Sequence, residues 1–168
     1  MAPIPEARYE AQGEIVDGVL YIFSGFNTTS PNINAIASTY AYNIASNTWQ
    51  RKADMPEVVT HAPTVAAGSI VYLLGGYLGN HPGASTNHVW KYDTATNSWS
   101  RGPDLPQPRG ASAAAIINNV IYVVAGATRT QGQLNDTDHT DFYKLDLNQS
   151  TPTWQVLPDI PMGRNHIG

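Results

Sequence analysis

Arginine and histidine recur at fixed distances after a repeated proline. The third residues after Pro5, Pro56, Pro106 and Pro161 are, in order, Arg8, Val59, Arg109 and Arg164. The fifth residues are Glu10, His61, Ala111 and His166. Residues two apart on an extended strand share a side, so we expect these side chains to face the same way. Converging guanidinium groups would clamp carboxylates or a sugar acid, whereas the alternative is that they satisfy backbone carbonyls or nearby carboxylates.

Three further candidate binding residues lie in polar stretches between apolar runs. They are Tyr77, His81 and Arg129. Side chains of these types are enriched at protein interfaces, and loops on a rigid scaffold are where binding is usually placed. We therefore add these three residues to the candidate binding set.

The same polar stretches do not predict a metal site. The histidines in or beside the long loops are His81, His88 and His139. Their spacing gives no set of three or four converging metal ligands. An acidic run resembles a calcium loop but lacks the glycine and the distal glutamate of an EF-hand, and it comprises Asn135, Asp136, Asp138 and Asp141. We expect no metal, no cofactor and no catalytic residue.

Composition excludes several partner classes. The 168 residues are 42% apolar, which suffices for a packed core, and they carry a net charge of −4 with 13% charged residues. Lysine and arginine do not cluster, so we expect neither nucleic acid nor a membrane surface as partner. No apolar run approaches about 18 residues and no signal sequence is recognisable, so we expect a soluble chain. The absence of cysteine excludes disulfides and thiolate chemistry but leaves the compartment open.

The candidate residues are carried by an internal repeat. An apolar run that ends in one or two glycines, or their remnant, occurs as Val19–Phe26, Ile70–Tyr77 and Val120–Ala127. In each unit the tyrosine of this run lies 16 residues after the proline, and each tryptophan (Trp49, Trp99 and Trp154) lies 7 residues before the next proline. Successive prolines are 51, 50 and 55 residues apart, a period typical of propeller or solenoid arrays.

Each unit predicts four antiparallel strands without helical periodicity. The first strand is weakly apolar, as in 60–67 and 110–118, and a polar turn such as Asp17-Gly18 or Asn118-Asn119 joins it to the apolar run. A long loop follows, over 27–38, 78–87 and 128–140. The third strand is expected over 39–44, 88–93 and 141–147, and the fourth opens at the tryptophan.

These landmarks resemble the kelch repeats of a β-propeller. The matching features are the pair Gly75-Gly76, a tyrosine (Tyr42 or Tyr92) seven before its tryptophan, and the closing Asp-x-Pro at Asp54, Asp104 and Asp159. Units one and three depart from the pattern, because Ser24-Gly25 and Ala125-Gly126 replace the glycine pair and Leu145 replaces the tyrosine. The resemblance implies an all-β fold of four-stranded blades. It also implies that the candidate residues surround the mouth of a central channel.

The chain is expected to hold three blades, at residues 5–55, 56–105 and 106–161, with residues 162–168 as the first strand of an incomplete fourth. A blade buries both faces against its neighbours, so three blades alone leave an apolar face at each end. The chain could be a fragment of a longer propeller or a half-propeller that forms a homodimer and closes a six-bladed ring, and we expect both together: a half-propeller from a larger parent that pairs when expressed alone. The alternative is an open monomer with frayed ends.

Three functions are compatible with this sequence. The first is a non-catalytic module that binds a protein or a small carbohydrate ligand at the channel mouth. The second is a carbohydrate-directed enzyme of the sugar-acid mutarotase type, which the family resemblance suggests and which would use the arginines with Glu10, His61 or His166 as proton carrier. The third is a truncated fragment without native activity. The repeat architecture and the polar loops favour the binding module.

Overall fold

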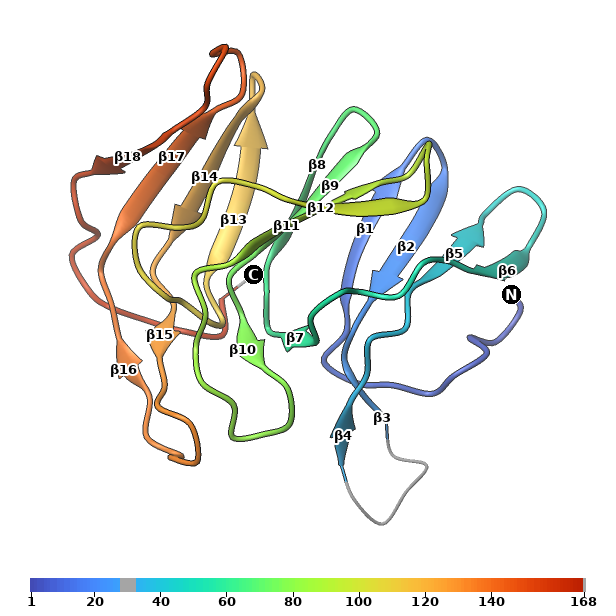
Figure 1. Ribbon diagram of the computed structural model, residues 1–168, viewed down its shortest axis with the longest axis horizontal. Helices are drawn as coiled ribbons and strands as arrows, with labels where there is room; N and C mark the ends of the chain where they lie inside the picture. Colours follow the sequence, from blue (N-terminus) through green and yellow to red (C-terminus); the bar gives the residue numbers. More distant parts are fainter. Residues whose placement is uncertain (28–32, 168) are drawn as a thin grey trace.

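The computed structural model describes residues 1–27 and 33–167, and it consists of three four-stranded antiparallel sheets packed face to face (Figure 1). The first sheet, in spatial order, comprises β1 (Gln12–Val16), β2 (Val19–Phe23), β5 (Tyr40–Asn43) and β6 (Thr48–Arg51). The second comprises β8 (Thr64–Ala67), β9 (Ile70–Leu74), β11 (Val89–Asp93) and β12 (Ser98–Arg101). The third comprises β13 (Ala113–Ile117), β14 (Val120–Val124), β17 (Phe142–Asp146) and β18 (Trp154–Leu157). The predicted all-β class and the four-stranded units are confirmed.

Short two-stranded ladders extend the sheets at one edge, the lower edge in Figure 1. They pair β3 (Phe26–Asn27) with β4 (Asn34–Ala35), β7 (Val59–Thr60) with β10 (Tyr77–Leu78), and β15 (Ala127–Thr128) with β16 (Thr137–Asp138). The long loops predicted from the sequence begin at β3, β10 and β15 of these ladders. Residues 28–32 of the first loop lie outside the described residues. Each unit thus presents its long loop at the same edge, which we call the mouth edge.

The hairpin turns lie at the opposite edge and have the predicted chemistry. Asp17 and Gly18 have φ of 49° and 76°, and Asn118 and Asn119 have φ of 51° and 63°. These are the left-handed conformations that a two-residue hairpin turn needs, and aspartate, asparagine and glycine adopt them at low cost.

The first strand of each unit is shorter than predicted. The expected strand 60–67 is divided into β7 and β8, and the expected strand 110–118 begins only at Ala113. The division occurs at the fifth residue after each proline, where the backbone is left-handed: Glu10, His61, Ala111 and His166 have φ of 53°, 55°, 54° and 50°. A left-handed residue interrupts an extended strand, so the two-residue periodicity used in the sequence analysis does not apply across this point.

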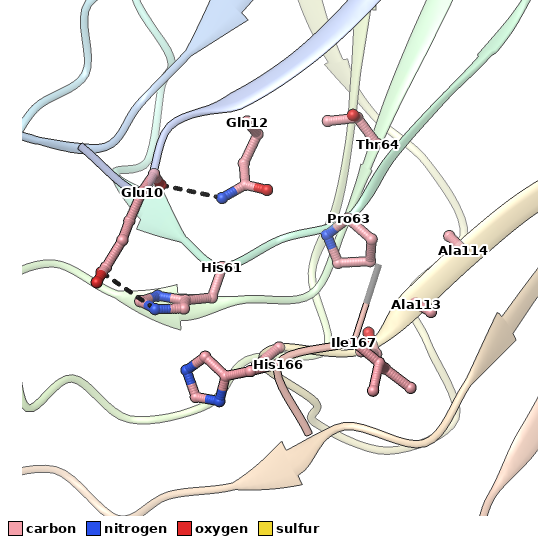
Figure 2. Close-up of a pocket in the computed structure, with 11 residues that line it drawn as sticks. Glu10, Gln12, His61, Pro63, Thr64, Ala113, Ala114, His166 and Ile167 are labelled. Atoms are coloured by element: carbon pink, nitrogen blue, oxygen red, sulfur yellow. Dashed lines mark hydrogen bonds and ion pairs between the residues drawn. The ribbon is translucent and has the colours of Figure 1, made fainter. Parts of the chain in front are cut away.

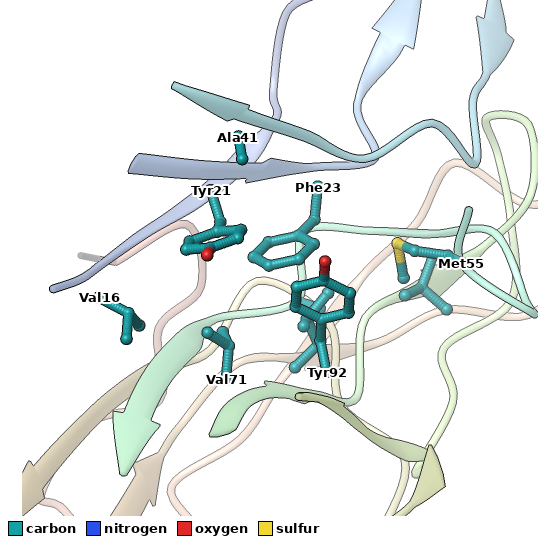
Figure 3. Packing of buried hydrophobic residues seen from close by; sticks show 10 residues of the cluster. Val16, Tyr21, Phe23, Ala41, Met55, Val71 and Tyr92 are labelled. Atoms are coloured by element: carbon teal, nitrogen blue, oxygen red, sulfur yellow. The ribbon is translucent and has the colours of Figure 1, made fainter. Parts of the chain in front are cut away.

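The core consists of apolar side chains that fill the spaces between successive sheets. Between the first and second sheets, Tyr21 and Phe23 meet Val71 and Tyr92, with all four side chains buried (Figure 3). The Phe23 and Tyr92 rings meet edge to face with centroids 5.5 Å apart. A second cluster between the second and third sheets includes Tyr72, Leu74, Ile121, Val123 and Leu145. The middle sheet is therefore covered on both faces, and the first and third sheets are each covered on one.

Each tryptophan ties its sheet to the segment before it. The indole Nε1 of Trp99 donates to the carbonyl of Ala53 at 3.0 Å, and that of Trp154 donates to the carbonyl of Pro103 at 2.8 Å. Trp49 makes the corresponding bond to Ala2 at 3.0 Å. The tryptophans thus join consecutive units, in agreement with a packing role.

The glycine pair of the second unit lets the next unit approach closely. A Cβ on Gly75 would lie 2.3 Å from the carbonyl oxygen of Arg109, and Gly76 donates its N–H to that same oxygen at 2.7 Å. Both glycines have positive φ, so any other residue would also be strained here. In the third unit Gly126 makes the corresponding bond to the carbonyl of Arg164 at 2.9 Å. Residues 162–167 therefore lie against the third sheet as a lead-in segment without strand structure, and residue 168 lies outside the described residues.

None of the described residues belongs to a helix that could cross a membrane.

Candidate functional site

A pocket of about 360 Å³ lies where the first strands of the three sheets begin (Figure 2). Its lining comes from β1, β8, β13 and the lead-in segments before them. Glu10, His61 and His166 supply its ionisable groups, and Pro63 and Ile167 form part of an apolar wall. The pocket thus gathers side chains from residues 10 to 167, and three of them are predicted candidates.

The Glu10 carboxylate lies against the His61 ring at the rim of this pocket. The distance between Glu10 Oε2 and His61 Nε2 is 3.2 Å, and the other ring nitrogen of His61 lies 3.1 Å from the Thr60 hydroxyl. The His61 side chain is 12% exposed and the Glu10 side chain 48%. Burial lowers the pKa of His61, and this effect exceeds the opposing attraction of Glu10. His61 is therefore neutral at pH 7, so the group beside Glu10 is not a permanent cation.

His166 lies across the small side chain of Ala111 from His61. The backbone N–H of Ala111 donates to the carbonyl of His61 at 2.9 Å, and the N–H of His166 donates to the carbonyl of Ala111 at 2.9 Å. The two imidazole rings meet edge to face with centroids 5.2 Å apart. Corresponding positions of three successive units thus form one row of backbone and side-chain contacts.

Arg8 and Arg109 do not line this pocket, because their guanidinium groups are buried inside their own sheets. Arg8 donates to the carbonyls of Ser24 and Ser38, at 2.9 and 2.8 Å, and also pairs with Glu6 at 2.9 Å. Arg109 forms an ion pair with Asp141. Their side chains are 3% and 4% exposed. The left-handed backbone at Glu10 and Ala111 turns these fifth residues away from Arg8 and Arg109, so the expected shared side is wrong for these two pairs.

Burial of these two arginines matches the alternative interpretation, in which they satisfy carbonyls and carboxylates of the protein. A carboxylate clamp, or an enzyme that acts on sugar acids, would need those guanidinium groups to be accessible in the pocket. Arg164, the third arginine, is exposed on the lead-in segment.

Tyr77 and Arg129 form a buried unit with Asp136. Arg129 donates from Nε and Nη2 to the two Asp136 oxygens, at 2.6 and 2.8 Å, and its guanidinium lies 4.0 Å from the centre of the Tyr77 ring. Burial, together with the Asp136 carboxylate, raises the pKa of Tyr77 to about 12. The His61 ring packs against Tyr77 with centroids 5.4 Å apart, so this unit helps to hold the His61 ring in the pocket lining.

Asp136 was not a predicted binding residue. The sequence places it seven residues after Arg129 in a polar loop, and nothing in that spacing marks the pairing. The ladder of β15 and β16 brings the two residues together.

The remaining predicted residue, His81, borders a second hollow at the mouth edge together with Tyr9, Glu10 and Phe26. The other histidines considered have partners within the protein. His88 lies 2.6 Å from Glu57, and His139 lies 2.9 Å from the Thr128 hydroxyl. Within residues 1–27 and 33–167, no three histidine or acidic side chains are grouped so as to hold a metal ion.

Comparisons with known proteins agree with the repeat. The family model described as the KLHDC2/KLHL20/DRC7 Kelch-repeats domain matches residues 1–166. The Rho GTPase-activating protein gacHH of Dictyostelium discoideum is 30% identical over 87 residues, which are 50% of this chain and 5% of that protein. The Kelch repeat protein M-T8 of Myxoma virus (strain Lausanne) is 29% identical over 88 residues, which are 52% of this chain and 16% of that protein.

Among solved structures, that of YjhT aligns with a TM-score of 0.81 and 15% identity. The alignment covers 94% of this chain and 54% of that one. The identity is low enough that the likeness concerns the fold alone. In each of these comparisons the matched region spans less than two thirds of the other protein.

Proposed function

This chain belongs to the Kelch-repeat family, and from that membership we propose that it is a protein-binding module whose recognition surface is the mouth edge. The short ladders of all three units lie at this edge (Figure 1). The pocket is lined by the lead-in segments and by the starts of the first strands. Loops held on a rigid sheet scaffold are the usual place for recognition.

Exposed apolar side chains on these loops are the observation that carries the proposal. Ile33, beside β4, is 58% exposed, and Leu134, between β15 and β16, is 72% exposed. Large apolar side chains that are exposed on polar loops do not contribute to the core, and they are the kind of group that becomes buried when a partner docks.

Selection from a displayed library of random peptides tests this proposal. Selected peptides should bind the native chain and the variant Ile44→Ser, since Ile44 is 53% exposed at the opposite edge. Binding should weaken by about tenfold or more in Ile33→Ser and Leu134→Ser, as expected for apolar contacts at the centre of an interface. Recovery of no peptide, or equal binding by all three variants, would overturn the proposal.

We further propose that two chains pair through their uncovered sheet faces as half-propellers. The outer face of the third sheet carries an apolar hollow lined by Ile117, Tyr122, Val124 and Phe142. Tyr122 and Val124 correspond in the repeat to Tyr72 and Leu74, which are covered by the next sheet inside the array. The same contact, made by the first sheet of a second chain, would close a six-bladed ring by twofold symmetry.

Light scattering behind size exclusion, over a hundredfold range of concentration, tests the pairing. The expected mass is twice 18.2 kDa. Ile117→Asp, at a residue that is 60% exposed on the third sheet, should return the mass to that of one chain, whereas Ile44→Asp should not. A single-chain mass for the native protein at every concentration would exclude the dimer.

A further inference from the structure

The pocket at the mouth edge has one permanent charge in its lining. Glu10 is the acidic residue there, and no lysine or arginine is among the described residues that line the pocket. Arg8, Arg109 and Arg129 are neutralised elsewhere by Glu6, Asp141 and Asp136. Two of the three arginines that suggested an anion site, Arg8 and Arg109, are thus committed to the protein, and the third, Arg164, is exposed but does not line the pocket. The charged side chain in the lining is therefore the Glu10 carboxylate.

The Glu10 carboxylate is positioned to accept a further partner. Its side chain is 48% exposed and lies 3.2 Å from a His61 ring that is mostly buried. A neutral imidazole can satisfy one oxygen of a carboxylate by a hydrogen bond, but it does not balance the charge. The second oxygen and the net charge remain available to a cation from outside.

The wall of the pocket across from Glu10 is apolar. Pro63, Ala113, Ala114 and Ile167 line the pocket on the side away from the carboxylate. A carboxylate next to an apolar wall matches a side chain with an aliphatic stem and a cationic head, because the stem can pack while the head pairs. Lysine and arginine are the protein side chains with that shape.

We propose that this pocket receives a lysine or arginine side chain of the protein partner, with its charged head on Glu10 and its stem against Pro63 and Ile167. This inference rests on the proposed function of the mouth edge as a protein-binding surface. It changes the expected chemistry of the partner from acidic to basic.

Protons should compete with this ligand. The groups around His61 are Glu10, His166, Arg129 and His81, with Tyr77 packed against its ring. When His61 becomes protonated, a cation lies 3.2 Å from Glu10, and a second cation is repelled. Because burial lowers the pKa of His61 below 6.5, affinity for a basic side chain should fall as the pH is lowered below 6.5.

N-acetyl-lysine amide is a suitable probe, with N-acetyl-norleucine amide as its uncharged match. In a titration followed by proton–carbon NMR of the histidine rings, the lysine probe should shift the His61 and His166 signals and saturate in the millimolar range. The norleucine probe should shift them at least about tenfold more weakly. Glu10→Gln should abolish the difference between the two probes, whereas Glu14→Gln, at a half-buried residue on β1 outside the pocket, should keep it.

Equal shifts by the two probes, or an unchanged titration in Glu10→Gln, would overturn the basic-ligand proposal. A thermal melt of each variant shows whether it is folded, and a rise to about 0.5 M salt in the native chain gives a second readout, since it should weaken an ion pair. If selected peptides bind the loops through Leu134 but are insensitive to Glu10→Gln, the binding module stands and the pocket assignment fails. If no peptide binds at all while the lysine probe does, the loop surface fails and the pocket stands.

Discussion

Arg129 holds both carboxylate oxygens of Asp136, at 2.6 and 2.8 Å, with side chains that are 6% and 15% exposed. Removing one member of a buried pair leaves an uncompensated charge, which typically costs about 3–5 kcal/mol. We therefore expect Arg129→Ala to lower the free energy of unfolding by that amount in urea denaturation. Arg51→Ala, which removes an exposed pair with Asp54, should cost no more than about 1 kcal/mol. Similar losses in the free energy of unfolding in the two variants would show that the buried Arg129–Asp136 pair contributes no more to stability than an exposed pair.

Arg8 and Arg164 occupy equivalent repeat positions but differ in burial, which gives a matched comparison. Arg8→Ala would leave the carbonyls of Ser24 and Ser38 without their donor. A buried acceptor without a partner costs about 1–3 kcal/mol, so we expect Arg8→Ala to destabilise by about 3 kcal/mol. Arg164→Ala, at an exposed residue, should change the free energy of unfolding by less than about 0.5 kcal/mol. Equal effects in chemical denaturation would contradict the structural role assigned to Arg8.

Stability should decrease with acid through His61. Burial lowers the pKa of His61 below its ordinary value of 6.5, so the unfolded chain takes up a proton that the folded chain resists. The free energy of unfolding is therefore constant above about pH 7 and falls as the pH drops below 6.5. Measured in urea between pH 8 and 5, the slope should be smaller in His61→Gln, although His139, whose pKa burial also lowers, keeps part of it. Asp93 and Asp136 have lowered pKa values and act only below about pH 4, outside this range. An unchanged slope in the variant would exclude His61 as its source.

Gly110 is required by the ring of Tyr77. A Cβ at this position would lie 2.5 Å from two ring carbons, so Gly110→Ala should displace Tyr77 and cost about 1–3 kcal/mol. Gly79 has a φ of 61° and no atom near its absent Cβ, so Gly79→Ala carries only the backbone strain of about 1 kcal/mol. Thermal melts of the two variants should therefore separate overpacking from strain. A milder effect at Gly110 than at Gly79 would contradict this assignment.

The sheets could be predicted from the sequence because their determinants are local. The run Ile70–Leu74 and the turn at Asn118 and Asn119 carry their own strand and turn preferences, and the repeat places them three times. The short ladders could not be predicted in the same way. Thr137 and Asp138 have no apolar pattern, and they pair with β15 because the third sheet brings the chain back to that point.

The site could be predicted only in part. Glu10, His61 and His166 were found because they share one repeat position, and they do meet around a pocket. The burial of Arg8 could not be predicted, because its guanidinium donates to backbone carbonyls of residues 16 and 30 positions away. No spacing rule indicates these contacts. The left-handed backbone at His61 could not be predicted either. Glycine would have indicated such a conformation, but histidine does not.

The bonds from tryptophan to the preceding segment set where one unit can be separated from the next. The Trp99 indole donates to the carbonyl of Ala53, which lies three residues before Pro56, so a unit cut at the proline loses the acceptor for its own indole. Residues 2–5 already supply such an acceptor to Trp49 through Ala2. Modules exchanged between propellers of this kind should therefore begin at the position of Ala53, three residues upstream of the landmark that the sequence displays.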